Sequence, residues 1–190
     1  MPRARRPFTA VATALAGVAA VALTTGAASP AAADGSGRPA AARTADEPSL
    51  TGTGKLARKP GDDVHFTFDA HGFLDKAHGT FRVSHRYGPK WSVSFNGRID
   101  CLITGGKAAV ATGVVTDSHV VDAPGMPKVR NLKGKRFGFT VLDEGREDRL
   151  GYSWALDGLP TKSVPKCLGS APFETVEKGD YKVHHWLPRR

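Results

Sequence analysis

Apolar and polar residues alternate with a period of two along most of the chain, beginning near Leu50. In segments 64–68 and 81–85 every second residue is Val, Phe or His, and the turn DAHGF (69–73) separates the two segments. This alternation is typical of strands with one side on a core and the other in solvent. The two segments therefore predict a pair of antiparallel strands.

A longer strand is predicted for residues 91–103. Trp91, Phe95 and Ile99 fall on one side of it, with an interruption at Gly97, and Cys101 is expected on that same apolar side. The turn TGGK then leads into residues 107–116, which are mostly Ala, Val and Gly. Such small residues fit close packing between neighbouring strands or a bulge.

Three further alternating segments, 137–141, 150–156 and 181–185, come next, and 50–56 is a weaker first strand. About eight strands at hairpin-like spacing predict an all-β fold, either an antiparallel barrel or a sandwich. No window has the apolar stripe of a substantial helix. The connections predicted at 117–134 and 158–179 are long, and long loops on a regular scaffold often carry a binding site.

The N-terminal region has the pattern of an export signal. Arginines precede an uncharged run rich in Ala, Val and Leu, and an A-x-A site ends at Ala33. We therefore expect a signal peptide at 1–33, a disordered linker at 34–48 and one all-β domain at 49–190. The expected location is extracellular, with no transmembrane segment after signal removal. The pair Arg5-Arg6 is compatible with either the twin-arginine or the general secretory route.

Composition adds a moderately basic balance. The chain has 27 Lys and Arg against 18 Asp and Glu, and removal of the three arginines in 1–33 leaves 24 basic residues. Its two cysteines, Cys101 and Cys167, both lie beyond the export signal. An even number of cysteines in an oxidising compartment favours a disulfide over a catalytic thiolate or a zinc site.

Three stretches resemble a known group of proteins. They are GDDVHFTFDAHG (61–72), FNGRIDCL (95–102) and FGFTVLDEGREDRLGYSWALDG (137–158). The resemblance is to small secreted actinobacterial proteins of unassigned activity, some of which carry the label repetin, and it spans roughly residues 50–186. It implies a secreted, mostly β domain and no particular reaction.

The strongest cluster of charge is KVRNLKGKR (128–136). Its five cations, Lys128, Arg130, Lys133, Lys135 and Arg136, have no acidic residue among them. Such a cluster can contact a polyanion such as an anionic cell-wall polymer; the alternative is a solvated loop. Aromatic residues are not interleaved with the cations, so a nucleic-acid partner is not expected.

The sequence offers little support for a metal site or for catalytic residues. The acidic turn of Asp143, Glu144, Glu147 and Asp148 offers oxygen ligands for calcium, but it lacks the order of a helix–loop–helix calcium loop and contains Arg146. Histidines recur along the chain, and local hydrogen bonding accounts for them better than a shared metal. We expect no cofactor and assign no catalytic residue.

The sequence therefore predicts a secreted, disulfide-linked β-domain of unknown activity, more in keeping with a binding protein than with an enzyme. In one alternative, the barrel interior binds a small apolar ligand; its expected lining is Trp91, Phe95, Phe137, Phe139, Tyr152 and Trp154. In another, the protein is a hydrolase whose residues converge only in three dimensions.

Overall fold

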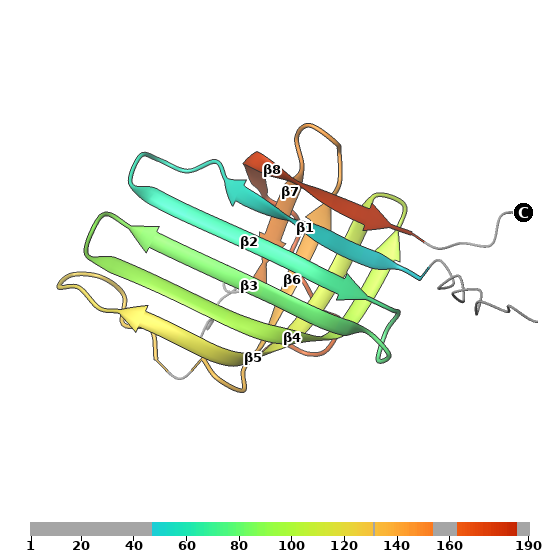
Figure 1. Cartoon of the computed structure of the whole chain (residues 1–190), viewed down its shortest axis with the longest axis horizontal. Coiled ribbons are helices and arrows are strands. Elements are labelled where there is room, and N and C mark those ends of the chain that lie inside the picture. The colour runs from blue at the N-terminus through green and yellow to red at the C-terminus, as the bar shows by residue number, and fades with distance from the viewer. Residues whose placement is uncertain (1–46, 131, 154–162, 186–190) are drawn as a thin grey trace, which may run out of the picture. The chain divides into compact units, whose positions relative to one another are not determined.

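The computed structural model describes residues 47–130, 132–153 and 163–185, and these form a closed, eight-stranded antiparallel barrel (Figure 1). The strands are β1 (Ser49–Leu56), β2 (Asp62–His71), β3 (His78–Tyr87), β4 (Trp91–Gly105), β5 (Ala108–Val121), β6 (Arg136–Leu142), β7 (Arg149–Tyr152) and β8 (Glu174–His184). The prediction of an all-β fold of about eight strands is confirmed, and the fold is the barrel rather than the sandwich. The described residues include no α-helix.

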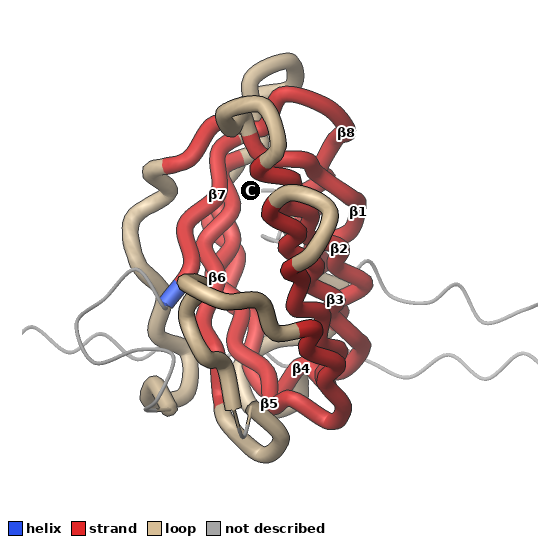
Figure 2. Tube along the Cα trace, turned by 90° about the vertical axis from the view of Figure 1, so that its left-hand side faces the viewer, coloured by secondary structure: helices blue, strands red, loops and turns tan. Residues whose placement is uncertain are grey.

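Each strand pairs with the next in sequence, and β1 pairs with β8 to close the barrel. The strand ends that are joined by 57–61, 88–90, 122–135 and 153–173 all lie at one end of the barrel, which we call the loop end. The connections 72–77, 106–107 and 143–148 lie at the opposite end, which we call the turn end. Figure 2 looks at the loop end, with its longer connections in front of the strands.

Alternation along the strands builds the core. In β2, Val64, Phe66 and Phe68 are buried, while the polar residues between them are partly exposed. The inward rings contact one another: Phe139 of β6 lies with its centroid 5.1 Å from that of Phe68 and 5.0 Å from that of Phe81. Aromatic contacts of this geometry are favourable beyond the burial of area alone. The period-two pattern thus correctly predicted the inward faces of β2 and β6.

The long hairpin of β4 and β5 contains two irregularities that change which side chains face inward. The pairing register shifts between Asn96 and Gly97 and again between Ile99 and Cys101. After the second shift Leu102, rather than Ile103, belongs to the core cluster. A bulge inserts one residue and so reverses the alternation beyond it. The prediction that Cys101 shares the core face with Trp91 is therefore wrong.

Three predicted boundaries also differ from the structure. β5 continues to Val121, and β8 begins at Glu174, so the long connections are shorter than the predicted 117–134 and 158–179. Both strands contain register shifts that interrupt a simple period of two. β7 ends at Tyr152; the rest of the predicted strand 150–156, apart from Ser153, lies outside the described residues.

Candidate ligand-binding site

An apolar cavity lies within the barrel at the loop end. Its volume is about 280 Å³, near the lower end of the roughly 300–1,000 Å³ typical of small-molecule sites. The residues that line it are Arg58, Val64, Val83, His85, Trp91, Val93, Phe95, Pro127, Val129, Leu132, Phe137 and Tyr152. Three of these, Arg58, His85 and Tyr152, carry polar groups that hydrogen-bond to carboxylates of the chain. The rest of the wall is mainly hydrocarbon, so it suits a ligand that is mainly apolar.

Small inward side chains from three strands form part of the cavity wall. Near the loop end, strands β2, β3 and β4 contribute Val64, Val83 and Val93 to the wall. Further along, the same strands present larger rings: Phe66, Phe68, Phe81 and Phe95 are all buried. A phenylalanine occupies space that a valine leaves, so the valines of these three strands leave part of the interior unfilled.

The β5–β6 connection (122–135) covers one side of the cavity. Pro127, Val129 and Leu132 line the wall from this connection, and Leu132 is 2% exposed. Lys128 and Lys133, which lie between or beside them, are exposed. The connection therefore has an apolar inner side and a cationic outer side.

The three polar side chains of the wall are held by two carboxylates. Arg58 Nη2 donates to Tyr152 Oη at 2.5 Å and also to Glu174, and Tyr152 Oη donates to Glu174 Oε1 at 2.9 Å. His85 Nε2 lies 2.6 Å from Asp62 Oδ1. These hydrogen bonds fix the direction of each polar side chain, and side chains held in this way can orient a ligand.

Burial, together with the hydrogen bond to Glu174, raises the pKa of Tyr152 to about 12. The phenol is therefore neutral at ordinary pH and keeps its proton as a donor. Among the described residues, no Ser, Thr, Cys or Lys side chain lines the cavity. The chemistry that this wall offers is packing and hydrogen bonding.

Two further donors of the wall have no acceptor. Arg58 Nε and Trp91 Nε1 are buried and make no hydrogen bond within the described part of the chain. The Trp91 ring meets that of His85 edge to face, with centroids 4.9 Å apart. A buried donor without an acceptor is costly, so a carbonyl or ether oxygen on a ligand would gain from meeting one.

The structure places four of the six residues expected to line the interior in the cavity wall: Trp91, Phe95, Phe137 and Tyr152. Phe139 is fully buried in the aromatic core instead, and Trp154 lies outside the described residues. Sequence reasoning missed eight lining residues: Arg58, the strand residues Val64, Val83, His85 and Val93, and Pro127, Val129 and Leu132 of the β5–β6 connection. For the residues of the connection, the signal in the sequence was that apolar residues are interspersed among the cations of 127–133.

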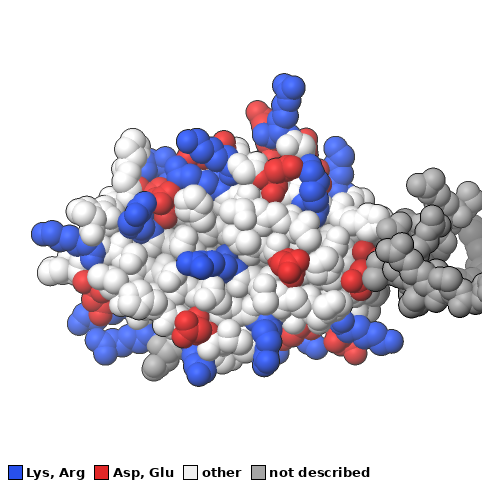
Figure 3. All heavy atoms as spheres, in the orientation of Figure 1, with Lys and Arg blue, Asp and Glu red and all other residues white. Residues whose placement is uncertain are grey.

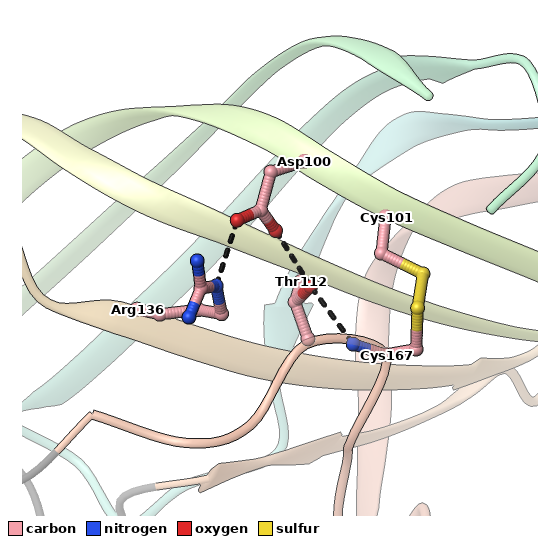
Figure 4. The surroundings of a disulfide bond; sticks show 5 residues. All are labelled: Asp100, Cys101, Thr112, Arg136 and Cys167. Atoms are coloured by element: carbon pink, nitrogen blue, oxygen red, sulfur yellow. Dashed lines mark hydrogen bonds and ion pairs between the residues drawn. A yellow bond between two sulfur atoms is a disulfide. The ribbon is translucent and has the colours of Figure 1, made fainter. Parts of the chain in front are cut away.

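The predicted disulfide between Cys101 and Cys167 is confirmed, and the two Cα atoms lie 5.4 Å apart. It fastens the connection before β8 to the outer side of the β4–β5 hairpin (Figure 4). Thr112 Oγ1 donates to Asp100 at 2.7 Å and accepts from the backbone N–H of Cys167 at 3.2 Å. Cys101 is fully buried but lies outside the hydrophobic core cluster. The disulfide is thus a link between a strand and a covering loop.

Two glycines let this loop lie directly on the barrel wall. A Cβ on Gly138 of β6 would come within 1.8 Å of the carbonyl oxygen of Leu168. A Cβ on Gly151 of β7 would come within 2.0 Å of that of Ala171. Any side chain at either position would push the loop away.

The structure divides the five cations of segment 128–136. Lys128, Arg130 and Lys133 are exposed, and Lys135 is partly buried. Arg136 instead donates through Nε to Asp100 at 2.7 Å, beside the disulfide (Figure 4). Arg136 therefore has a structural partner, and the outward charge of the segment rests on the first three residues.

The acidic turn is organised around backbone donors. Asp148, which is 3% exposed, accepts from the N–H groups of Glu144, Gly145 and Tyr181. Asp143 accepts from the N–H of Val183. Glu147 is exposed, like Glu144. Within the described ranges, no three Asp, Glu, His or Cys side chains come together as a metal site would require.

The described residues contain no helix long and apolar enough to cross a membrane. Comparison of the chain with protein-family models, with curated proteins and with solved structures finds no match in any of the three. Any function assigned to the chain therefore rests on the geometry of the barrel and its cavity.

Proposed function

We propose that the protein is an exported binding protein whose barrel takes one small, mainly apolar molecule at the loop end. The observation that carries this proposal is the cavity of about 280 Å³ with its valine and aromatic wall. An apolar cavity of about 150 Å³ accommodates a benzene ring. The space here therefore suits a molecule about the size of a fused pair of rings or a short alkyl chain.

Export is part of the proposal. It is supported by the arginine, apolar and A-x-A pattern of residues 1–33, and by the disulfide, since disulfides persist in oxidising compartments. Mass spectrometry of the culture medium is expected to find a mature chain that begins at Asp34. Recovery of the intact chain, with Met1, from the cytoplasm would contradict export.

Binding is tested by isothermal titration calorimetry of the mature protein with naphthalene. We expect saturable binding at one site. Val93→Phe and Val129→Phe each add a ring to the cavity wall, one from a strand and one from the covering connection, and each is expected to weaken binding at least tenfold. Val121→Phe is the matched control, because Val121 is 42% exposed and is not among the residues of the cavity wall.

Circular dichroism of all three variants shows whether the barrel is retained. Absence of saturable binding by the wild type would overturn the proposal. Equal binding by the wild type and by both filled variants would also overturn it, since the ligand would then lie elsewhere.

A second titration tests the role of the unpartnered donors in the wall. A methyl ketone of naphthalene adds an acceptor to the same ring system, so we expect it to bind more tightly than naphthalene itself. Trp91→Phe removes the Nε1 donor and keeps an aromatic ring. If Trp91 meets the ketone, the variant loses the difference between the two ligands; an unchanged difference would assign it to another group.

A further inference from the structure

The loop end is strongly cationic. Among the described residues of its connections there are eight Lys or Arg, namely Arg58, Lys59, Lys90, Lys128, Arg130, Lys133, Lys135 and Lys166. The same connections contain one described acidic residue, Asp122. Six of the eight cations are exposed, the exceptions being Arg58 and Lys135. Figure 3 shows Lys and Arg side chains projecting from this end, at its left.

The turn end has the opposite balance. Its connections and the residue pair before β1 contain six acidic residues, Glu47, Asp75, Asp143, Glu144, Glu147 and Asp148. They contain three basic residues, Lys76, Lys107 and Arg146. The connections at the two ends therefore differ in the sign of their net charge, and the positive connections are those at the end that holds the cavity. A field of this kind orients a protein as it approaches an anionic surface.

Aromatic side chains accompany the cations at the loop end. Tyr87, at the end of β3, is 52% exposed, and Phe173, just before β8, is 43% exposed. In β3 alternate residues share a face, so Tyr87 lies on the same side as His85 of the cavity wall. Exposed rings among cations are suited to the interface of a lipid bilayer, where the rings enter the headgroup region.

We propose that the loop end docks on an anionic phospholipid surface, with the cavity directed toward the bilayer. Lys128, Arg130 and Lys133 would contact headgroup phosphates from the outer side of the β5–β6 connection, while Val129 and Leu132 of the same connection line the cavity. Each cation near an anionic leaflet adds to binding, and the effect falls off within a Debye length. Docking itself does not depend on the proposed ligand. If that ligand exists, docking lets it pass between bilayer and cavity without crossing water.

Co-sedimentation of the mature protein with vesicles tests this proposal. Vesicles of phosphatidylcholine with about 30% phosphatidylglycerol are compared with vesicles of phosphatidylcholine alone. We expect binding only to the anionic vesicles, and weaker binding as salt is raised. The triple variant Lys128→Ser, Arg130→Ser, Lys133→Ser is expected to lower the partition coefficient about 10- to 100-fold.

The matched control is Lys76→Ser, Lys107→Ser, Arg146→Ser at the turn end. It removes two exposed lysines and one exposed arginine, as the first triple does, so both variants have the same net charge. We expect it to bind within about twofold of the wild type. Equal loss in both triples would overturn the proposal, because net charge rather than the loop end would then govern binding. So would equal binding to both kinds of vesicle.

A soluble polyanion is the alternative partner for the same cations, and the aromatic residues separate the two. Tyr87→Ser is expected to weaken vesicle binding about threefold or more and to leave binding to dextran sulfate unchanged. Phe73→Ser, at a turn-end residue that is 47% exposed, is the control and should change neither. If Tyr87→Ser leaves vesicle binding unchanged and dextran sulfate binds as tightly as the vesicles, the surface recognises a polyanion and the lipid proposal fails.

The cavity variants keep this proposal separate from the proposed ligand. Val129→Phe is expected to lose naphthalene binding and to retain vesicle binding. The triple at Lys128, Arg130 and Lys133 is expected to show the reverse. Loss of vesicle binding in Val129→Phe while its barrel remains folded would contradict docking through the outer side of the connection.

Discussion

The two ends of the barrel close the same wall in different ways. At the turn end, the connections 72–77, 106–107 and 143–148 are short, and the buried carboxylate of Asp148 gathers three backbone N–H groups. At the loop end, 122–135 and 153–173 are long; a disulfide fastens one of them, and the other covers a cavity. One end has short connections held by hydrogen bonds to a buried carboxylate, and the other has long connections, one of which carries a disulfide.

This difference shows how one closed sheet can form a packed core and also enclose a cavity. The inward phenylalanines give the barrel a continuous core, whereas the valines near the loop end leave space above it. Long connections can then line that space without disturbing the strand pairing. The core and the cavity thus share part of their wall, since Phe95 and Phe137 belong to both.

The largest expected effect concerns the disulfide. Replacing Cys101 and Cys167 together by Ser is expected to lower the free energy of unfolding by about 4 kcal/mol, because the bond closes a long loop in the unfolded chain. Urea unfolding measures the change, and naphthalene binding should weaken as well if the loop end loosens. In the wild type both cysteines should resist thiol labelling until reduced. A change below about 1 kcal/mol would mean that noncovalent contacts suffice to hold the loop.

Asp148→Ala tests how much the buried carboxylate at the turn end contributes to the free energy of unfolding. We expect it to lower the free energy of unfolding by about 3 kcal/mol, because the buried N–H of Tyr181 and two turn N–H groups lose their acceptor. Glu147→Ala, in the same turn but exposed, should change stability by less than about 0.5 kcal/mol. Naphthalene binding by the folded Asp148→Ala protein should persist. Loss of binding would show that the two ends are less independent than the structure indicates.

The smallest expected effect is a pH dependence at the loop end. The pKa of Tyr152 in the folded protein is about 12, above the ordinary 10.0, mainly because of burial. Its contribution to stability is therefore complete below about pH 10 and is lost as pH rises from about 10 through 12, where the unfolded chain ionises first. Tyr152→Phe should flatten this decline in urea unfolding between about pH 9 and 11.5. A decline identical to that of the wild type would place its origin elsewhere, for example at Tyr181, whose pKa burial also raises.

The alternating pattern predicted most of the barrel because inward and outward residues must differ wherever one face is buried. It predicted four cavity residues for the same reason, since Trp91, Phe95, Phe137 and Tyr152 lie on inward faces. It failed at Cys101, where a bulge reverses the alternation. It also missed Arg58, which precedes β2 and meets Tyr152 only after β1 and β7 are brought together.

The sequence by itself determined the approximate number of strands, most of their inward faces and the pairing of the only two cysteines, because these depend on local periodicity and on counting. Only the tertiary structure decided that the sheet closes, that valines from three strands line one cavity, and that the cations gather at the cavity end. Those outcomes depend on register and on connections between residues far apart in the chain. Side-chain alternation repeats every two residues and carries no information about which strands become neighbours.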